Sequence, residues 1–297
     1  MTAHSVTQCC RKGIGLFRGA TSPFRMLPSF IIFGVGRCGT TSLYNYLTGH
    51  PNVGAAQEKE ILFFDYHFNK GLAWYKKNFP LRKFYKSSQH KWITGDATPS
   101  YMHHPLAPHR IKEILPEVKL ILLLRNPVER AYSHYCQKIN AQLETFPFEL
   151  AVRYQLQERA FFQKEKVLGN EKYFRHVYYP HAYISKGVYI ENIKKWFALF
   201  PKEHILVLQN EEMSKEPQRI FQKTLAFLEL PAWEPKEFKK YNYHGDHYSV
   251  PRPSSQKAKY EPLTPELRQE LMEYFRPYNE QLYEFLGIDL GWENQKG

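Results

Sequence analysis

The sequence predicts an α/β fold: one domain with a central parallel β-sheet and helices on both faces. Short apolar or β-branched runs, the expected strands, alternate along the chain with longer segments of helical periodicity. One such run ends in a glycine-rich turn that leads into a helix, and another ends in an arginine. No repeat or long Pro/Gly/Ser linker divides the chain, and 297 residues, 43% of them hydrophobic, can bury one large core.

The expected elements follow from these patterns. Strands are predicted at residues 29–34, 91–95, 119–125 and 204–209. Helices are predicted at residues 41–48, 106–115, 127–143, 147–163, 188–199, 215–228 and 265–286. The last helix has the clearest boundaries, because Thr264 is a suitable N-cap and Gly287 follows its end. Its apolar stripe is expected to face the core and consists of Leu267, Leu271, Tyr274, Tyr278, Leu282 and Phe285.

The turn at residues 34–39 is suited to hold a phosphate. Gly34 and Gly39 let the backbone bend tightly, and the first N–H groups of the following helix point toward an anion there. The loop of nucleoside triphosphatases requires G-x-x-x-x-G-K-[ST], but Thr40 occupies the lysine position and the only cation is Arg37, inside the loop. This pattern argues against a kinase or ATPase. It suits a donor whose transferred group is attached to a nucleotide 5′-phosphate.

A second anion-binding group follows the apolar run at residues 120–124. Arg125 would emerge at the carboxyl end of a buried strand, the edge at which open α/β sheets bind ligands. Its guanidinium can bind a phosphate through two hydrogen bonds. Pro127 is expected in the first turn of the next helix, which carries Ser133 eight residues after Arg125.

Together these motifs resemble the sulfotransferases that use 3′-phosphoadenosine 5′-phosphosulfate (PAPS). Residues 58–65 and 71–75 are similar to segments of heparan sulfate and related carbohydrate sulfotransferases, in particular soluble, bacterial-type members. Further matches lie at residues 95–101, at 187–189 with Trp196, and at 276–282, so the resemblance covers residues 29–288. It implies the P-loop nucleotide-kinase-like sulfotransferase fold, with a domain at residues 28–290 and a tail at 291–297.

The resemblance also implies a chemistry and a set of site residues. PAPS would donate a sulfuryl group to a hydroxyl or amine and leave as 3′,5′-ADP, without a metal. Glu60 matches the family's catalytic base, and Arg37 replaces the usual loop lysine, where its permanent charge could stabilise the leaving phosphate. The long loop at residues 241–262 is expected to cover the nucleotide. The predicted donor-binding residues are Gly36, Arg37, Cys38, Gly39, Thr40, Thr41, Ser42, Arg125, Ser133, Gly187, Tyr189, Tyr248, Lys257 and Lys259.

Several of these assignments have alternatives. Glu60 follows Lys59 and could form only a surface ion pair, in which case Glu58, His67 or His134 would be the base. Cys38 is either a small residue that fills a tight loop or a nucleophile. A nucleotide kinase and a non-catalytic nucleotide-binding protein are the alternative functions.

The acceptor is less well defined than the donor. The family's usual basic residue after the acidic residue is replaced by Ala97, and the cysteine pair of the Golgi enzymes' C-terminal hairpin is absent. The acceptor is therefore expected to be a small metabolite or a carbohydrate. The net charge of +12 is attributed to a cleft that attracts anions and not to nucleic-acid binding, because the Lys and Arg residues form no recognisable groove-reading module.

Composition predicts a soluble, cytoplasmic protein and leaves its oligomeric state open. The four cysteines form no C-x-x-C pair, and no run reaches the roughly 18 apolar residues of a membrane span. The first 57 residues contain no Asp or Glu. A disordered basic leader at residues 1–27 is favoured over an organelle transit peptide.

Overall fold

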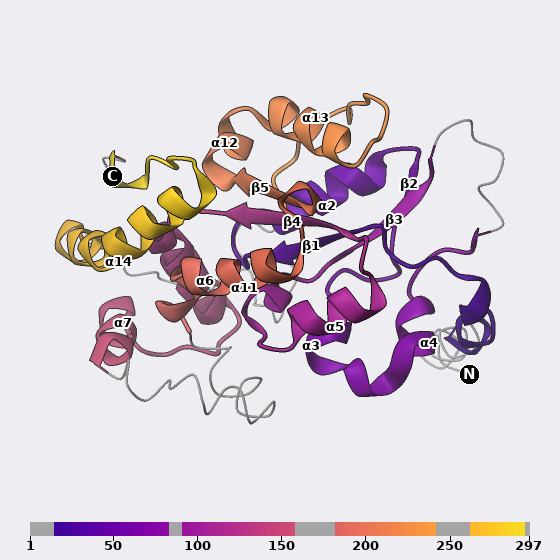
Figure 1. Ribbon diagram of the computed structural model, residues 1–297. Coiled ribbons are helices and arrows are strands. Elements are labelled where there is room, and N and C mark those ends of the chain that lie inside the picture. Colours follow the sequence, from indigo (N-terminus) through magenta and orange to yellow (C-terminus); the bar gives the residue numbers. More distant parts are fainter. Residues whose placement is uncertain (1–14, 83–90, 158–181, 242–261, 295–297) are drawn as a thin grey trace.

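The computed structural model describes residues 15–82, 91–157, 182–241 and 262–294 and confirms the α/β architecture. Five parallel strands lie in the order β2-β3-β1-β4-β5, with helices on both faces of the sheet (Figure 1). The strands are β1 (Phe30–Gly34), β2 (Val53–Gly54), β3 (Ile93–Ala97), β4 (Lys119–Leu124) and β5 (Ile205–Gln209).

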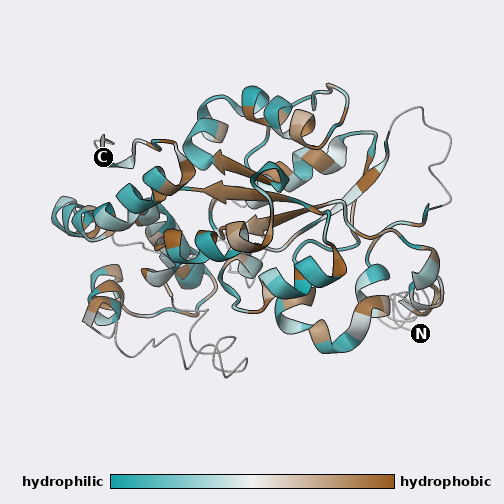
Figure 2. Ribbon diagram, in the orientation of Figure 1, coloured by the Kyte–Doolittle hydropathy of each residue, from teal (hydrophilic) through white to brown (hydrophobic). Residues whose placement is uncertain are grey.

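The central strands are apolar because the sheet is covered on both sides. Every residue of β1 and β3 is buried, and so is every residue of β4 after Lys119. Figure 2 shows β4 and its neighbours as continuous hydrophobic arrows, which is typical of a parallel sheet between two helical layers. Phe30 of β1 lies opposite Gly95 on one side and opposite Lys119 on the other.

The helices form the two outer layers. In Figure 1, α2, α12 and α13 lie on one side of the sheet, and α5, α6 and α11 lie on the other. Proline occupies the first turn of α6, α13 and α14, as expected where the missing N–H has no helical partner. The helices are α2 (Thr40–Gly49), α3 (Phe63–Tyr66), α4 (Gly71–Lys76), α5 (Ala107–Ile114), α6 (Pro127–Asn140), α7 (Phe148–Gln157), α11 (Ile190–Leu199), α12 (Asn210–Lys215), α13 (Pro217–Phe227) and α14 (Pro265–Leu286).

The boundaries of α14 are confirmed, but its buried stripe differs from the predicted one. Thr264 Oγ1 accepts a hydrogen bond from Leu267 N (3.2 Å), and Gly287 ends the helix with a φ of 68°. At three positions beyond Leu271 the buried residue is the one after the predicted residue, because the buried residues of the helix are spaced mainly four apart. Phe285, predicted in the core, is 40% exposed. The buried residues are Leu267, Leu271, Phe275, Asn279, Leu282 and Leu286.

The short elements β2, α3, α4 and α12 were not predicted, and the apolar run before Phe64 is not strand-like. Glu60 and Leu62 have φ values of 62° and 57°, and the helix α3 begins at Phe63. Tyr101 explains this turn, because its hydroxyl accepts a hydrogen bond from Phe63 N (3.0 Å). The helix predicted at residues 147–163 is described only as far as Gln157.

Part of the predicted leader is folded against the domain. Ser22–Phe24 form a 3-10 helix, and the buried Arg25 donates from Nη1 to the Phe79 carbonyl (2.7 Å). Arg25 also forms a β-bridge with Leu81. Residues 15–27 are therefore held by contacts with the segment that follows α4, while residues 1–14 lie outside the described part of the chain.

Candidate active site

The glycine-rich loop follows β1, the middle strand of the sheet. Since β3 and β4 flank β1, the chain connections diverge there, and the carboxyl ends of these strands form the edge at which open α/β sheets bind ligands. Thr40, Thr41 and Ser42 form the first turn of α2, and its N-cap residue, Gly39, has no side chain with which to cap the helix. The turn thus offers backbone N–H groups and the positive end of the helix dipole to an anion.

Gly39 is required at the end of this loop for two reasons. Its φ is 87°, and a Cβ atom there would lie 2.4 Å from Met213 Cε and 2.7 Å from Asn210 Nδ2. Asn210 also donates from Nδ2 to the Cys38 carbonyl (3.1 Å). The unpredicted helix α12 therefore braces the loop from the neighbouring side of the sheet.

Substitution of Gly39 should separate the cost of the left-handed backbone from the cost of crowding against α12. We expect Gly39→Ala to lower the free energy of unfolding by about 2–4 kcal/mol, from left-handed strain plus overpacking against α12. Gly287→Ala is the matched control, since its φ is 68° and nothing lies within 4 Å of the added Cβ. Urea denaturation should show a loss of only about 1 kcal/mol for the control. Equal losses for the two variants would contradict the role of α12.

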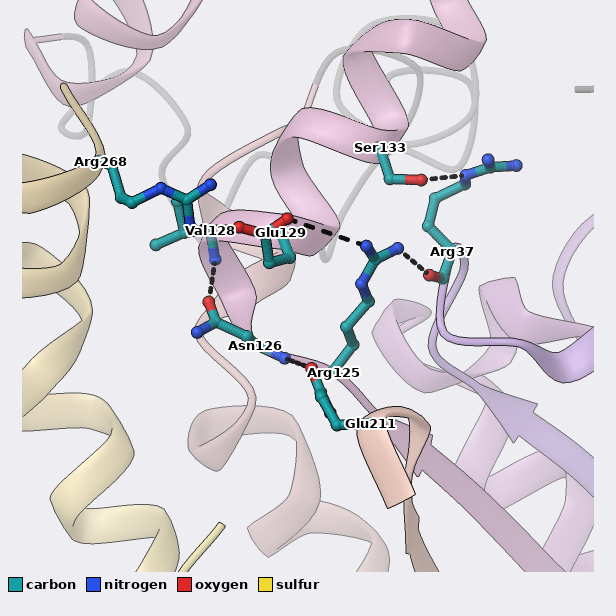
Figure 3. Close-up of polar contacts among 8 residues, drawn as sticks. All are labelled: Arg37, Arg125, Asn126, Val128, Glu129, Ser133, Glu211 and Arg268. Carbon is teal, nitrogen blue, oxygen red and sulfur yellow. Dashed lines mark hydrogen bonds and ion pairs between the residues drawn. The ribbon is translucent and has the colours of Figure 1, made fainter. Parts of the chain in front are cut away.

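Arg37, Arg125 and Ser133 come together from three elements: the loop, the end of β4 and α6 (Figure 3). Arg37 Nε donates to Ser133 Oγ (3.1 Å), and Arg125 Nη1 donates to the Arg37 carbonyl (3.3 Å). Burial, and then the nearby charge of Arg125, lowers the pKa of Arg37, although a guanidinium stays protonated at neutral pH. Two neighbouring cations at this edge of the sheet favour a ligand with more than one negative charge.

Arg125 is oriented from its other side by a carboxylate. Glu129 Oε2 lies 3.9 Å from Arg125 Nη2, and its Oε1 pairs with Arg268 of α14 (Figure 3). Glu129 is thus shared between two arginines from different parts of the chain. The Arg125 guanidinium is held between this carboxylate and the Arg37 carbonyl.

The backbone around Arg125 is also fixed. Asn126 N donates to Glu211 Oε1 (2.8 Å), and the Asn126 side chain caps α6 by accepting from Val128 N (3.0 Å). The buried Tyr189 donates its hydroxyl to the Arg125 carbonyl (2.8 Å). Neither Asn126 nor Glu211 was singled out from the sequence; an Asn before a helix-starting proline is the signal that identifies the cap.

Tyr189 and Gly187 were predicted to bind the donor, but the structure shows them buried among residues that support the site. Tyr189 is 1% exposed, so its hydrogen bond to Arg125 accounts for its position. Gly187 is buried, and a Cβ there would lie 2.8 Å from the Phe275 ring of α14. Direct contact of either residue with the donor stays a prediction.

Cys38 fills the loop as a small residue. It is buried, and burial raises the pKa of its thiol to about 12. The thiolate that a nucleophile requires is therefore negligible at neutral pH. Gly36 precedes Arg37 in the same loop.

The chain also approaches the first turn of α2 from residues 239–241. Tyr241 N donates to Ser42 Oγ (3.1 Å), and Tyr46 donates its hydroxyl to the Lys239 carbonyl (2.7 Å). The long loop predicted to cover the nucleotide therefore begins beside Ser42. Tyr248, Lys257 and Lys259 lie outside the described residues, and their assignments stay predictions.

Glu60 lies at the carboxyl end of β3, the strand next to β1. Its N–H donates to the Ala97 carbonyl (3.1 Å), which places it at the same edge of the sheet as the loop and Arg125. Its side chain is 28% exposed and forms an ion pair with Lys59, 2.6 Å from Oε1 to Nζ. The ion pair considered from the sequence thus exists, and it lies at the ligand-binding edge.

A buried hydrogen-bond network supports the Glu60 turn. Asp96 accepts from the hydroxyls of Tyr75 and Tyr101 (2.9 Å each) and from Thr98 Oγ1 (2.7 Å). Tyr101 in turn receives the N–H of Phe63, so the network fixes the start of α3. Asp96 lies in the segment 95–101 that resembles the family, but no role was assigned to it from the sequence. An acidic residue inside an otherwise buried strand indicates that such a residue needs hydrogen-bond partners.

Asp65, the neighbouring buried carboxyl, should make stability depend on pH. Burial raises its pKa to about 7, despite hydrogen bonds from Ser100 and Tyr66. The folded protein then holds a proton that the unfolded chain releases above about pH 4, so stability falls as pH rises from about 4 to 7. Urea denaturation should show that the unfolding free energy falls between about pH 5 and 8 in the wild type, and that this fall is smaller in Asp65→Asn by on the order of 2 kcal/mol. Equal pH dependence of the unfolding free energy in the two proteins would contradict this role. Burial also raises the pKa of Asp96, so the unfolding free energy of Asp65→Asn should still fall somewhat as pH rises.

The two histidines considered as bases are His134 of α6 and His67, which follows α3. His134 is buried with its ring 4.9 Å from that of Tyr183, and burial followed by the charge of Lys186 lowers its pKa well below the usual value. His67 follows α3 and packs its ring 5.0 Å from Trp74. Neither position matches the strand-end location of Glu60.

Comparison with known proteins identifies the family. The family model described as "Sulfotransferase domain" matches residues 27–286. The chain belongs to the sulfotransferase family. It is therefore an enzyme that transfers sulfate, which sets aside the kinase alternative.

This sulfotransferase has relatives in several organisms. It is 26% identical to the membrane-associated sulfotransferase kil1 of Dictyostelium discoideum, over 90% of this chain and 67% of that protein. It is 29% identical to the heparan sulfate glucosamine 3-O-sulfotransferase 6 of Mus musculus, over 91% of this chain and 75% of the relative. The fold is that of a solved sulfotransferase from Alicyclobacillus acidocaldarius, with a TM-score of 0.66 at 22% identity, covering 91% of this chain and 100% of the other.

Within the described ranges, no helix of the sulfotransferase combines the length and apolar character needed to cross a bilayer. In the same ranges, no three His, Cys, Asp or Glu residues are grouped so as to hold a metal ion. Metal-free transfer remains a prediction.

Proposed function

We propose that this sulfotransferase moves the sulfuryl group of PAPS to a hydroxyl or amine of a carbohydrate or small metabolite, with Glu60 as the general base. The observation that carries the proposal is the meeting of Arg37, Arg125 and Ser133 beside the first turn of α2. PAPS carries phosphate at both its 3′ and 5′ positions, so two guanidiniums and a helix N-terminus fit its charge.

Donor binding would rearrange one contact of the site. The family resemblance implies that Arg37 holds the 5′ end of the nucleotide and that Arg125 and Ser133 hold its 3′-phosphate. In the structure, however, Arg37 donates to Ser133. This hydrogen bond would be exchanged for contacts to phosphate oxygens. Arg125, held by Glu129 and the Arg37 carbonyl, can keep its orientation during the exchange.

The transfer itself needs positioning and charge stabilisation more than covalent catalysis. The acceptor oxygen or nitrogen forms a bond to sulfur while the bond from sulfur to the 5′-phosphate oxygen breaks. The acceptor proton passes to Glu60, and the charge on the departing 3′,5′-ADP is stabilised by Arg37 and the α2 N-terminus. The adjacency of β1 and β3 supports this arrangement, because it brings Glu60 and the loop to one edge.

The proposed acceptor class is supported by the relatives and by one sequence difference. Relatives named for heparan sulfate glucosamine suggest a sugar acceptor, while Ala97 replaces the family's usual basic residue there.

We propose a cytoplasmic location from cysteine usage; the relative kil1 is named as membrane-associated.

Ligand-induced stabilisation tests the donor assignment. Because a ligand that binds only the folded state raises the melting temperature, 3′,5′-ADP without metal should stabilise the protein more than ATP with magnesium. The opposite ranking would overturn the donor assignment. Incubation with labelled PAPS and a panel of sugars and metabolites, followed by mass spectrometry, should then identify a product carrying one added sulfate.

A further inference from the structure

The positive charge of this protein is concentrated in one part of the chain. Residues 1–95 contain thirteen Lys and Arg residues but only three Asp and Glu residues, which accounts for ten of the twelve net positive charges. The three acidic residues are the buried Asp65 and the pair Glu58 and Glu60 near the sheet edge. Lys59 pairs with Glu60 and Lys91 pairs with Glu229, whereas the described cations on either side of α4 have no acidic residue near them in the sequence.

Large apolar side chains are exposed in the same part of the molecule. Leu16, Phe17 and Phe24 are 77%, 60% and 68% exposed, and Leu72 of α4 is 40% exposed. Single exposed apolar residues are ordinary, but several in adjoining segments mark a contact surface.

Hydrogen bonds place these segments side by side. Arg18 Nε donates to the Lys77 carbonyl (2.7 Å), and Lys76 Nζ donates to the Pro23 carbonyl (3.2 Å). The exposed cations Lys70 and Arg82 lie just before and after α4. We call this region the N-terminal surface; it consists of Leu16, Phe17, Phe24, Leu72, Lys70, Lys76, Lys77 and Arg82.

We propose that the N-terminal surface docks on an anionic lipid bilayer. Cations within a Debye length of anionic headgroups are attracted to them, and Phe and Leu side chains gain free energy by entering the headgroup boundary. A sulfated glycan or a nucleic acid would satisfy the cations but leave the apolar side chains in water. An apolar protein groove would cover the side chains but not use the excess charge. An anionic bilayer surface matches both properties.

Docking in this way would leave the candidate active site accessible. In Figure 1, α4 and the segment before β1 lie at the opposite end of the molecule from α14, toward which the arrowheads of β4 and β5 point. Arg125 follows β4 and pairs through Glu129 with α14. The enzyme would thus bind the bilayer at one end and its substrates at the other.

Vesicle sedimentation of the full chain tests the proposal. The wild-type protein should bind phosphatidylcholine vesicles with about 30% phosphatidylglycerol at least tenfold more tightly than pure phosphatidylcholine vesicles. The triple variant Leu16→Ser, Phe17→Ser, Phe24→Ser should weaken this binding roughly tenfold or more. The matched control is Leu143→Ser, Phe146→Ser, Leu150→Ser, which removes three exposed apolar side chains before and within α7 and should change nothing.

A charge variant completes the test. Lys70→Gln, Lys76→Gln, Arg82→Gln should also weaken binding to the anionic vesicles, and added salt should have less effect on it than on the wild type. The proposal would be overturned by equal binding to both vesicle types, or by equal losses in the α7 control and the N-terminal variant. A third result would also overturn it: neither the wild type nor the triple apolar variant binds vesicles, but both bind soluble heparin equally tightly. The surface would then recognise a polyanion.

Discussion

Glu60→Gln is expected to lower turnover by about 100-fold or more while leaving the affinity for 3′,5′-ADP nearly unchanged. The amide keeps the size of the side chain but cannot take the acceptor proton. Glu60 stands at the end of β3 and the donor residues stand at the ends of β1 and β4, so removing the base should not disturb the nucleotide site. Calorimetric titration with 3′,5′-ADP and initial rates with labelled PAPS would measure the two quantities.

Glu58→Gln is the matched control for this experiment. Glu58 is exposed two residues earlier and carries the same charge, so it reports the effect of losing one carboxylate nearby. The control should retain most of the wild-type rate. If Glu58→Gln lost activity and Glu60→Gln kept it, the base assignment would move to Glu58.

Arg125→Ala is expected to weaken 3′,5′-ADP binding by about 1.5–3 kcal/mol, roughly 10- to 150-fold in Kd. The loss should be specific for the 3′-phosphate. The wild type should bind 3′,5′-ADP more tightly than 5′-AMP, and the variant should nearly abolish that preference. Isothermal titration with both nucleotides gives the ratio directly.

Arg153→Ala controls for the loss of one positive charge. Arg153 lies on α7, is 45% exposed and pairs with Glu149 at 2.8 Å, so its removal should leave both affinities unchanged. Equal weakening of 3′,5′-ADP and 5′-AMP by Arg125→Ala would remove this arginine from the 3′-phosphate site. It would then act at a different phosphate or only through the loop.

The long strands could be predicted from the sequence because both of their faces are covered by apolar packing. β1 and β4 are enclosed on both faces, and such strands require continuous apolar residues that are visible without a structure. The caps of α14 were equally local, since Thr264 and Gly287 act on their own helix ends. Convergence of Arg37 and Arg125 could be expected for the same reason, because parallel strands end at a shared edge.

The remaining features depend on contacts between distant residues. The turn at Glu60 is set by Tyr101 and Ala97, and the phosphate loop is braced by Asn210, 172 residues after Cys38. No local pattern around Glu60 or Cys38 contains this information. The family resemblance indicated Glu60 as a candidate site residue, but its left-handed backbone and the surroundings of the loop could not be predicted.

The sharing of Glu129 between Arg125 and Arg268 has a consequence for biosynthesis. Arg268 lies 139 positions beyond Glu129, on the helix that follows the whole sheet. A nascent chain can complete the sheet and the loop well before α14 has left the ribosome, yet the Glu129 carboxylate that orients Arg125 then lacks its second arginine. Newly made protein should therefore acquire full nucleotide affinity only after translation has passed α14.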